Sequence, residues 1–258
     1  MMSLNSAVIL GSGNVASHLG KAFTAAGIKV LQVFSRRLEH AQRLAGELCC
    51  DATDNMDDLR ADASFYVIAV TDDAIEELAA AFPHPKKLLL HTSGSTDMQL
   101  LKAGSNNYGV FYPLQTFSRE MALDFSSVPI CLEVSDKALK APLDELAGRL
   151  SKQVAWISSE KRRSLHLAAV FACNFVNHMY ACADDLLEGK ELDFELLRPL
   201  IMETARKVML AKPAEVQTGP AKRGNKNVLE AHAMMLKDKP GLQKMYNFIS
   251  ESIMQMHK

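Results

Sequence analysis

The stretch AVILGSGNVA at residues 7–16 decides the fold of the first half of the chain. A short apolar run leads into Gly11 and Gly13, and Ala16 completes a G-x-G-x-x-A pattern. Gly11 permits a sharp exit from a strand, Gly13 lets the backbone approach a pyrophosphate, and Ala16 lets a helix pack closely on the sheet. Because the pattern follows an apolar strand and opens an amphipathic helix, it predicts dinucleotide binding rather than a plain strand-to-helix turn.

The predicted phosphate-binding turn continues into the first turn of that helix. Backbone N–H groups and the positive end of the helix dipole favour anions at a helix N-terminus. We therefore expect the cofactor to lie against Gly11, Ser12, Gly13, Asn14 and Val15.

The first part of the chain alternates short apolar runs with helical segments, which is typical of an α/β fold. The predicted strands are 7–10, 29–34, 48–51, 64–70, 87–91, 109–112, 129–134 and 154–157. The predicted helices between them include 14–26, 37–48 and 73–82. This order predicts a Rossmann domain with a doubly wound parallel sheet.

After residue 157 the pattern predicts helices only. Apolar residues stepping by three and four predict one long helix over 160–187, and further helices follow at 197–210, at 225–236 and from 240 onward. We expect an NADP-binding Rossmann domain over 1–157 and an all-helical substrate and dimerisation domain over 158–258. The apolar seam of the long helix favours a homodimer through these helices.

Composition excludes several classes of protein. The 258 residues are 48% hydrophobic and 23% charged, with a formal net charge of -1, so no field attracts nucleic acid or an acidic membrane. No apolar run approaches the roughly 18 residues of a membrane span, and the N-terminal run is too short for a signal-peptide core. Five cysteines without a C-x-x-C pair favour a reducing compartment, and we expect a cytoplasmic protein.

The residues at the end of the second predicted strand indicate whether the cofactor is NAD or NADP. An NAD site usually places an acid there for the ribose 2′-hydroxyl, whereas an NADP site uses arginine for the 2′-phosphate. The chain has Ser35, Arg36 and Arg37 at this point and no acid before Glu39. This predicts NADP(H) as the cofactor. Ser35 could also cap the next helix with the arginines solvated, a role compatible with phosphate binding.

The ends of three further predicted strands lie at the edge where ligands of an open α/β sheet bind. The candidate cofactor-binding residues are Val70, Thr71, His91, Thr92 and Ser93, and the candidate substrate-binding residues are Gln115 and Thr116. The alternatives are a polar turn for 91–95 and a loop without ligand contact for 115–116. For Asp72 and Asp73 we expect helix capping.

The long predicted helix carries an unusual set of polar residues. At 100° per residue, His166 and Asn177 lie about 20° apart and Asn174 about 80° from His166. His166 and Asn174 are the candidate catalytic residues, since a histidine can donate the proton that a reduced carbonyl or imine needs. Asn177 is a candidate substrate-binding residue. Interface hydrogen bonds are the alternative for each of them.

The segment 218–225 gathers turn formers around a basic pair, and Asn225 is the expected N-cap of the following helix. Arg223 is a candidate for binding an anionic substrate group, and an exposed interhelical loop is the alternative. No spacing of His, Cys, Asp or Glu indicates a metal site, and neither a Ser-His-Asp arrangement nor a Tyr-x-x-x-Lys motif is visible.

With these motifs the chain resembles the NADP oxidoreductase family that joins a Rossmann-like domain to a helical domain of unknown function. The matching pieces are GSGNVA at 11–16, AVTDDAI at 69–75, HTSGS at 91–95, YPLQTF at 112–117, HLAAVFACN at 166–174 and TGPAKRGN at 218–225. The wider superfamily includes pyrroline-5-carboxylate reductases, deazaflavin-dependent NADP oxidoreductases and hydroxyacid dehydrogenases of the 6-phosphogluconate dehydrogenase type. The resemblance implies a Rossmann domain and a helical domain that often forms a dimer.

One departure from that superfamily bears on function. The hydroxyacid dehydrogenases place a lysine four residues before an asparagine of the long helix, and here Val170 stands four before Asn174. The sequence therefore predicts an NADP(H)-dependent oxidoreductase that acts on a small carbonyl, imine or related substrate. The alternative is a regulatory or scaffold protein that binds NADP(H) without turnover, and a nucleic-acid-binding module is disfavoured by the charge balance.

Overall fold

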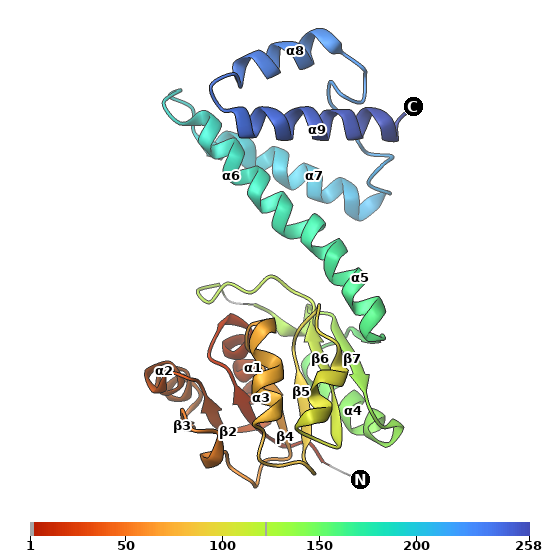
Figure 1. Cartoon of the computed structure of the whole chain (residues 1–258). Helices are drawn as coiled ribbons and strands as arrows, with labels where there is room; N and C mark the ends of the chain where they lie inside the picture. Colours follow the sequence, from red (N-terminus) through yellow and green to blue (C-terminus); the bar gives the residue numbers. More distant parts are fainter. Residues whose placement is uncertain (1–2, 122) are drawn as a thin grey trace. The chain divides into compact units, whose positions relative to one another are not determined.

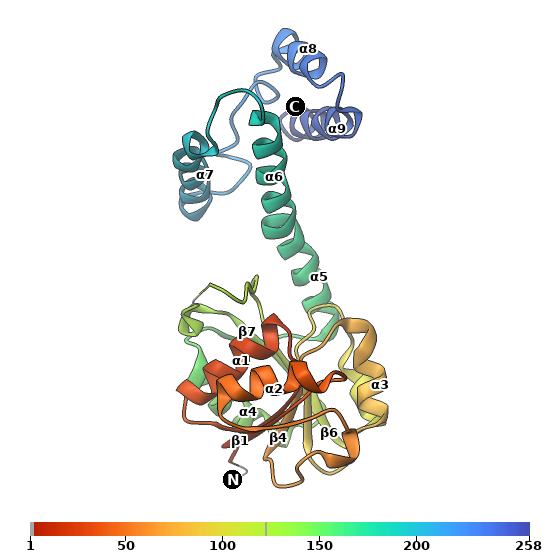
Figure 2. The ribbon, with the colours of Figure 1, turned by 90° about the vertical axis from the view of Figure 1, so that its left-hand side faces the viewer.

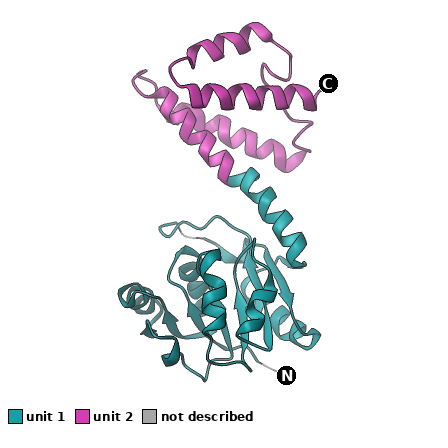
Figure 3. Cartoon of the chain, viewed as in Figure 1, with its two compact units in different colours: residues 1–173 teal, residues 174–258 magenta. Residues whose placement is uncertain are grey.

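The computed structural model describes residues 3–121 and 123–258. The chain divides into two compact units, the first ending at Cys173 and the second running from Asn174 to Lys258 (Figure 3). The change from alternating strands and helices to helices alone comes earlier, at residue 157. The division between compact units thus falls within the long helical stretch, and the domain limit at 157 stays a prediction.

The first unit is built on an eight-stranded sheet with the order β3-β2-β1-β4-β5-β6-β7-β8 (Figure 1). The strands are β1 (Ser6–Leu10), β2 (Lys29–Phe34), β3 (Asp51–Thr53), β4 (Phe65–Ile68), β5 (Leu88–His91), β6 (Asn107–Pro113), β7 (Ile130–Val134) and β8 (Val154–Trp156). The order runs away from β1 in both directions, so the crevice that binds ligands in such sheets lies at the carboxyl ends of β1 and β4. The predicted α/β Rossmann class is confirmed.

Besides small shifts in strand ends, two features of the sheet differ from the prediction. β6 and β7 are antiparallel, because among the described residues of 114–129 the only helical segment is η4 (Phe125–Ser127), too short for a parallel crossover. The third strand is Asp51–Thr53 rather than 48–51. Leu48 still belongs to the preceding helix, which ends on a left-handed Cys49 with φ 53°.

Helices cover both faces of the sheet. One face packs against α1 (Asn14–Ala25), α2 (Leu38–Leu48) and α4 (Lys140–Leu150), and the other against α3 (Ile75–Ala80) and η3 (Met98–Ala103). Alternate residues of β1 divide between the faces, Ala7 and Ile9 on the first and Val8 and Leu10 on the second. Figure 2 shows α1 and α2 together on the first face and α3 on the other.

The helical stretch after the sheet is not a uniform α-helix. α5 (Ser159–Ala169) is followed by a π-helical segment, η6 (Val170–Phe175), and then by α6 (Val176–Leu187). A π-turn closes its hydrogen bonds over five residues rather than four, so the spacing of 100° per residue fails across it. The angles predicted between His166, Asn174 and Asn177 are therefore wrong, although the helical stretch itself is confirmed.

The second unit is helical throughout, with α6 (Val176–Leu187), η7 (Phe194–Leu197), α7 (Arg198–Leu210), α8 (Lys226–Met235) and α9 (Pro240–Met256). Asn225 caps α8 as predicted, since its Oδ1 accepts a hydrogen bond from the backbone N–H of Val228 at 3.3 Å. Many large apolar side chains of this unit are exposed, among them Met209 and Met235. Among the described residues, none of the helices combines the length and apolarity that a membrane crossing requires.

Candidate functional site

The glycine turn after β1 has the geometry of a backbone that approaches its neighbours very closely. Gly11 has φ 133°, and a Cβ there would lie 2.1 Å from the backbone oxygen of Ala69 at the end of β4. Its N–H donates to the carbonyl of Phe34 at 2.8 Å. Gly11 therefore joins the ends of β1, β2 and β4, and any side chain at this position would force the strands apart.

Gly13, in contrast to Gly11, is surrounded by open space. A Cβ at Gly13 would have no heavy atom within 4 Å, so the missing side chain leaves open space at the N-cap of α1. The cap receives no side-chain hydrogen bond, and the first turn carries no acidic residue. The first N–H groups of a 12-residue helix thus face outward for an anion, an arrangement that fits a cofactor pyrophosphate.

The end of β2 offers two exposed guanidinium groups and a hydroxyl. The hydroxyl of Ser12 donates to that of Ser35 at 3.1 Å, which links the glycine turn to this strand end. Ser35 does not cap α2, because the N-cap position is Arg37 and no side chain caps it. Arg36 and Arg37 are exposed. The donor set suits a 2′-phosphate, since guanidinium groups bind phosphate with two parallel hydrogen bonds.

Beside this turn, Val70 and Thr71 come after β4, which ends at Ile68 and not at residue 70 as predicted, and Val70 lies against Gly11. The prediction that Asp72 and Asp73 cap a helix is wrong. The N-cap of η2 (Asp72–Ala74) is Thr71 without a side-chain hydrogen bond, and Asp72 instead accepts a hydrogen bond from the Ser95 hydroxyl. The carboxylate of Asp72 thus joins the loops after β4 and β5.

The loop after β5 is largely buried and is held by hydrogen bonds. Ser93 Oγ accepts from the N–H groups of Ser95 and Thr96 at 3.1 and 3.0 Å, and the N–H of Thr92 donates to the carbonyl of Ile68 at 3.1 Å. His91 has no exposed surface, and its Nδ1 accepts from the N–H of Ser93 at 3.1 Å. The ring of His91 therefore supports the loop from within, and only the loop's outer atoms are open to a ligand.

Burial sets the charge of His91. Burial, together with the positive charge of Arg162, lowers the pKa of His91 to about 3. The ring is neutral at physiological pH, with its proton on Nε2 because Nδ1 accepts a hydrogen bond. Nε2 has no hydrogen-bond partner among the described residues.

His166 of α5 stands directly against this loop. Its Nδ1 lies 3.1 Å from the hydroxyl of Tyr112 at the end of β6, and the two rings meet edge to face at 6.1 Å. Gly94 makes the approach possible, because a Cβ there would lie 2.6 Å from His166 Nδ1 and 2.8 Å from Tyr112 Cζ. Burial raises the pKa of Tyr112 to about 12, so the phenol keeps its proton. It can therefore donate to a neutral imidazole and accept from a protonated one.

The segment after β6 is tied to the first turns of α1. Asn14 Nδ2 donates to the carbonyl of Phe117 at 2.9 Å, and His18 Nε2 lies 2.9 Å from the carbonyl of Ser118. This places Gln115 and Thr116, both exposed, on a segment held beside the glycine turn. Gln115 Oε1 accepts from the N–H of Thr116 at 2.8 Å.

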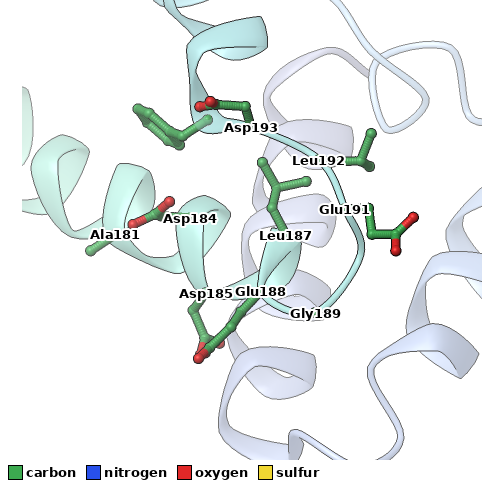
Figure 4. A pocket seen from close by; sticks show the side chains of 10 residues that line it. Ala181, Asp184, Asp185, Leu187, Glu188, Gly189, Glu191, Leu192 and Asp193 are labelled. Carbon is green, nitrogen blue, oxygen red and sulfur yellow. The ribbon is translucent and has the colours of Figure 1, made fainter.

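The other predicted site residues belong to the second unit. Asn174 is its first residue, Asn177 lies on α6, Arg223 lies on the loop before α8, and all three side chains are exposed. A hollow of about 850 Å³ in the same unit surrounds the turn after α6 (Figure 4). No group of three or more His, Cys, Asp or Glu among the described residues could hold a metal.

Three residues of the site were missed in the sequence. Tyr112 and Gly94 lie inside quoted motifs, and a small residue facing a polar pair is visible only in three dimensions. Arg162 stands in a short basic run from Lys161 to Arg163, yet its side chain is fully buried. Its position four residues before His166 puts both on one face of α5, and this spacing was the available signal.

Comparisons with known proteins agree with this geometry. Residues 6–93 match the family described as NADP oxidoreductase coenzyme F420-dependent, and residues 128–253 match a domain of unknown function, DUF2520. No curated protein sequence matches the chain. The "putative NADP oxidoreductase" of Bacteroides fragilis is 40% identical over 99% of this chain and 100% of that chain, with a TM-score of 0.93.

More distant solved structures share the fold. The 1-pyrroline-5-carboxylate reductase of Streptococcus pyogenes is 13% identical over 98% of both chains, with a TM-score of 0.66. The reductive aminase of Aspergillus terreus in complex with NADPH and ethyl-5-oxohexanoate is 15% identical over 98% of this chain and 94% of that chain, with a TM-score of 0.73. Given 40% identity over nearly its whole length, the chain belongs to the NADP oxidoreductase family, whose cofactor NADP(H) is the one that Ser35 to Arg37 predict.

Proposed function

We propose that the protein transfers a hydride between NADP(H) and a small carbonyl or imine substrate. The observation that carries the proposal is the His166–Tyr112 pair, packed against the loop after β5 at the carboxyl edge of a nucleotide-binding sheet. The imine class is included because a reductive aminase in complex with NADPH has the same fold.

The cofactor would be held by groups that the structure leaves available. The turn Gly11 to Val15 would bind the pyrophosphate through backbone N–H groups, and Ser35, Arg36 and Arg37 would bind the 2′-phosphate. Val70, Thr71 and the outer atoms of the loop 91–93 would border the nicotinamide side. When bound, NADPH supplies the hydride, and the protein supplies orientation and the proton.

His166 is the proposed proton donor. When the ring is protonated, Nδ1–H donates to the Tyr112 oxygen and fixes the ring, while Nε2–H gives its proton to the substrate oxygen or nitrogen. The hydride adds to carbon and the proton to the heteroatom, so the charges balance. Gln115 and Thr116 would line the site. Asn174, Asn177 and Arg223 stay proposals for substrate contact from the second unit: the two amides for a substrate heteroatom, and Arg223 for an anionic group.

The test is a screen of carbonyls and imines that follows NADPH oxidation, with His166→Ala as the decisive variant. We expect His166→Ala to lose turnover at least about 100-fold, the usual contribution of general acid catalysis, while its affinity for NADPH is unchanged. Full turnover by His166→Ala would refute the catalytic assignment.

A second function, NADP(H) binding without turnover, is favoured by one observation. The lysine of the related hydroxyacid dehydrogenases is replaced by Val170. This alternative predicts tight NADPH binding with no oxidation by any member of the panel.

We also propose a homodimer formed through the helical unit and a cytoplasmic location. Exposed apolar side chains gather on the helices of that unit, which is typical of a subunit interface. All five cysteines are free, in keeping with a reducing compartment.

A further inference from the structure

The first turn of α5 is anchored by a buried guanidinium group. Arg162 has no exposed surface and is the largest fully buried side chain among the described residues. Its Nη1 donates to Glu133 Oε2 of β7 at 2.6 Å. Its Nη2 donates to Ser159 Oγ at 3.1 Å and to the carbonyl of Thr96. One side chain thus holds together α5, β7 and the loop after β5.

Glu133 and Ser159 complete the cluster. Glu133 accepts from the N–H of Ser159 at 2.9 Å and from its hydroxyl at 2.7 Å. Ser159 Oγ also accepts from the N–H of Met98 at 3.2 Å. The carboxylate therefore binds both the helix N-terminus and the guanidinium, which fixes the rotation of α5 about its axis as well as its position.

Arg162, Glu133 and Ser159 form a clamp on α5, and Arg162 lies one helical turn before His166. Residues four apart share a face of an α-helix, so Arg162 and His166 both point to the loop 91–96. Arg162 holds the carbonyl of Thr96, and His166 packs on Gly94 of the same loop. Any rotation of α5 that released Arg162 would also move His166 away from Tyr112.

Anchoring α5 does not by itself require an ion pair. Taking an ion pair out of water is costly, and apolar residues of similar volume usually hold a helix at least as firmly. Arginine's planar fork, in contrast, fixes direction through several hydrogen bonds at once. The pair of the buried Arg162 and the partly buried Glu133 is therefore better suited to orientation than to stability.

We propose that Arg162, with Glu133 as its partner, is a positioning residue that sets the orientation of His166 against Tyr112. The role in turnover rests on the proposed function, in which His166 gives the proton. The orientation itself is a property of the unliganded chain and is measurable without any substrate.

The experiment follows the ring ¹⁵N resonances of His166 by NMR, assigned with His166→Ala. Tyr112→Phe supplies the reference position of a His166 ring without its hydrogen bond. The test variants are Arg162→Lys and the double variant Arg162→Met with Glu133→Gln, which removes both charges and leaves an acceptor for the N–H of Ser159. Arg163→Gln is the matched control. Arg163 lies on the same turn of α5 as Arg162, but its ion pair with Asp97 is exposed.

We expect both test variants to shift the His166 resonances to the Tyr112→Phe position, with NADPH affinity within about two-fold of the parent chain. Arg163→Gln should leave the resonances in place. Unchanged His166 resonances in either folded test variant would overturn the proposal, and so would failure of both to fold, since the pair would then serve the fold itself. Full turnover by His166→Ala would refute the proposed function. The NMR result on the orientation of His166 would still hold.

Discussion

At Gly94 the site depends on the absence of a single methyl group. The position leaves room for the rings of His166 and Tyr112, whose atoms lie 2.6 and 2.8 Å from the point a Cβ would occupy. We predict that Gly94→Ala separates the two rings and lowers stability by about 1–3 kcal/mol, as overpacking does. Turnover should fall as well, because His166 loses its contact with the Tyr112 hydroxyl.

The control for this change is Gly46→Ala. Gly46 lies within α2 with nothing within 4 Å of its Cβ position, so alanine there should raise stability by roughly 0.5–1 kcal/mol. Urea unfolding and NADPH oxidation measure both effects. Parent-like turnover in Gly94→Ala would show that the close ring contact is not needed.

His91 gives the protein a predictable sensitivity to acid. Its pKa falls from an ordinary 6.5 to about 3 in the folded chain because the ring is buried. The unfolded chain therefore binds more protons between these values, so stability is fully present above pH 6.5 and is lost as pH falls toward 3. At about 1.4 kcal/mol per pH unit, His91 should cost about 2 kcal/mol between pH 6.5 and pH 5.

The variant His91→Asn isolates this contribution, because an asparagine oxygen can still accept from the N–H of Ser93. Urea unfolding at pH 7 and pH 5 should show a smaller loss of stability for His91→Asn than for the parent chain. Equal losses would mean that the ring is protonated in the folded state at pH 5.

At the scale of elements, local patterns predicted most of the structure. The apolar runs and the G-x-G-x-x-A turn determine β1, β2, β4 and β5, because strands covered on both faces are apolar throughout. The direction of β7 could not be predicted, since it depends on the path of the chain between β6 and β7. The π-helical segment η6 also escaped prediction, because the apolar seam continues across it with unchanged spacing.

The same limit applies to the site. The glycine turn and the arginines after β2 are local signals, and their chemistry can be read along the chain. The His166–Tyr112–Gly94 contact joins three elements, and the burial of Arg162 depends on Glu133, 29 residues earlier. Long-range pairing of this kind leaves no periodic trace in a single sequence.

For the whole molecule, the exposed apolar surface of the helical unit is the strongest indication of assembly. Met209, Met235 and Phe248 are 83%, 80% and 74% exposed, an arrangement that a lone helical unit in water does not favour. We predict that sedimentation equilibrium gives twice the 28.4 kDa mass of one chain.

Charged substitutions separate this prediction from nonspecific association. Leu200→Glu with Met209→Glu on α7 should give a folded monomer, whereas Leu38→Glu on α2 of the first unit should leave the dimer intact. If the parent chain sediments as a monomer, the predicted dimer is wrong.

The most direct test of the central claim is a calorimetric titration of the purified protein with NADPH and NADH in parallel. The account predicts clear preference for NADPH, and Arg36→Ala with Arg37→Ala should weaken NADPH binding by about 10- to 100-fold, as expected for lost charged hydrogen bonds, while Arg43→Ala does not. Binding of neither nucleotide, or equal binding of both with no effect of the double variant, would contradict it.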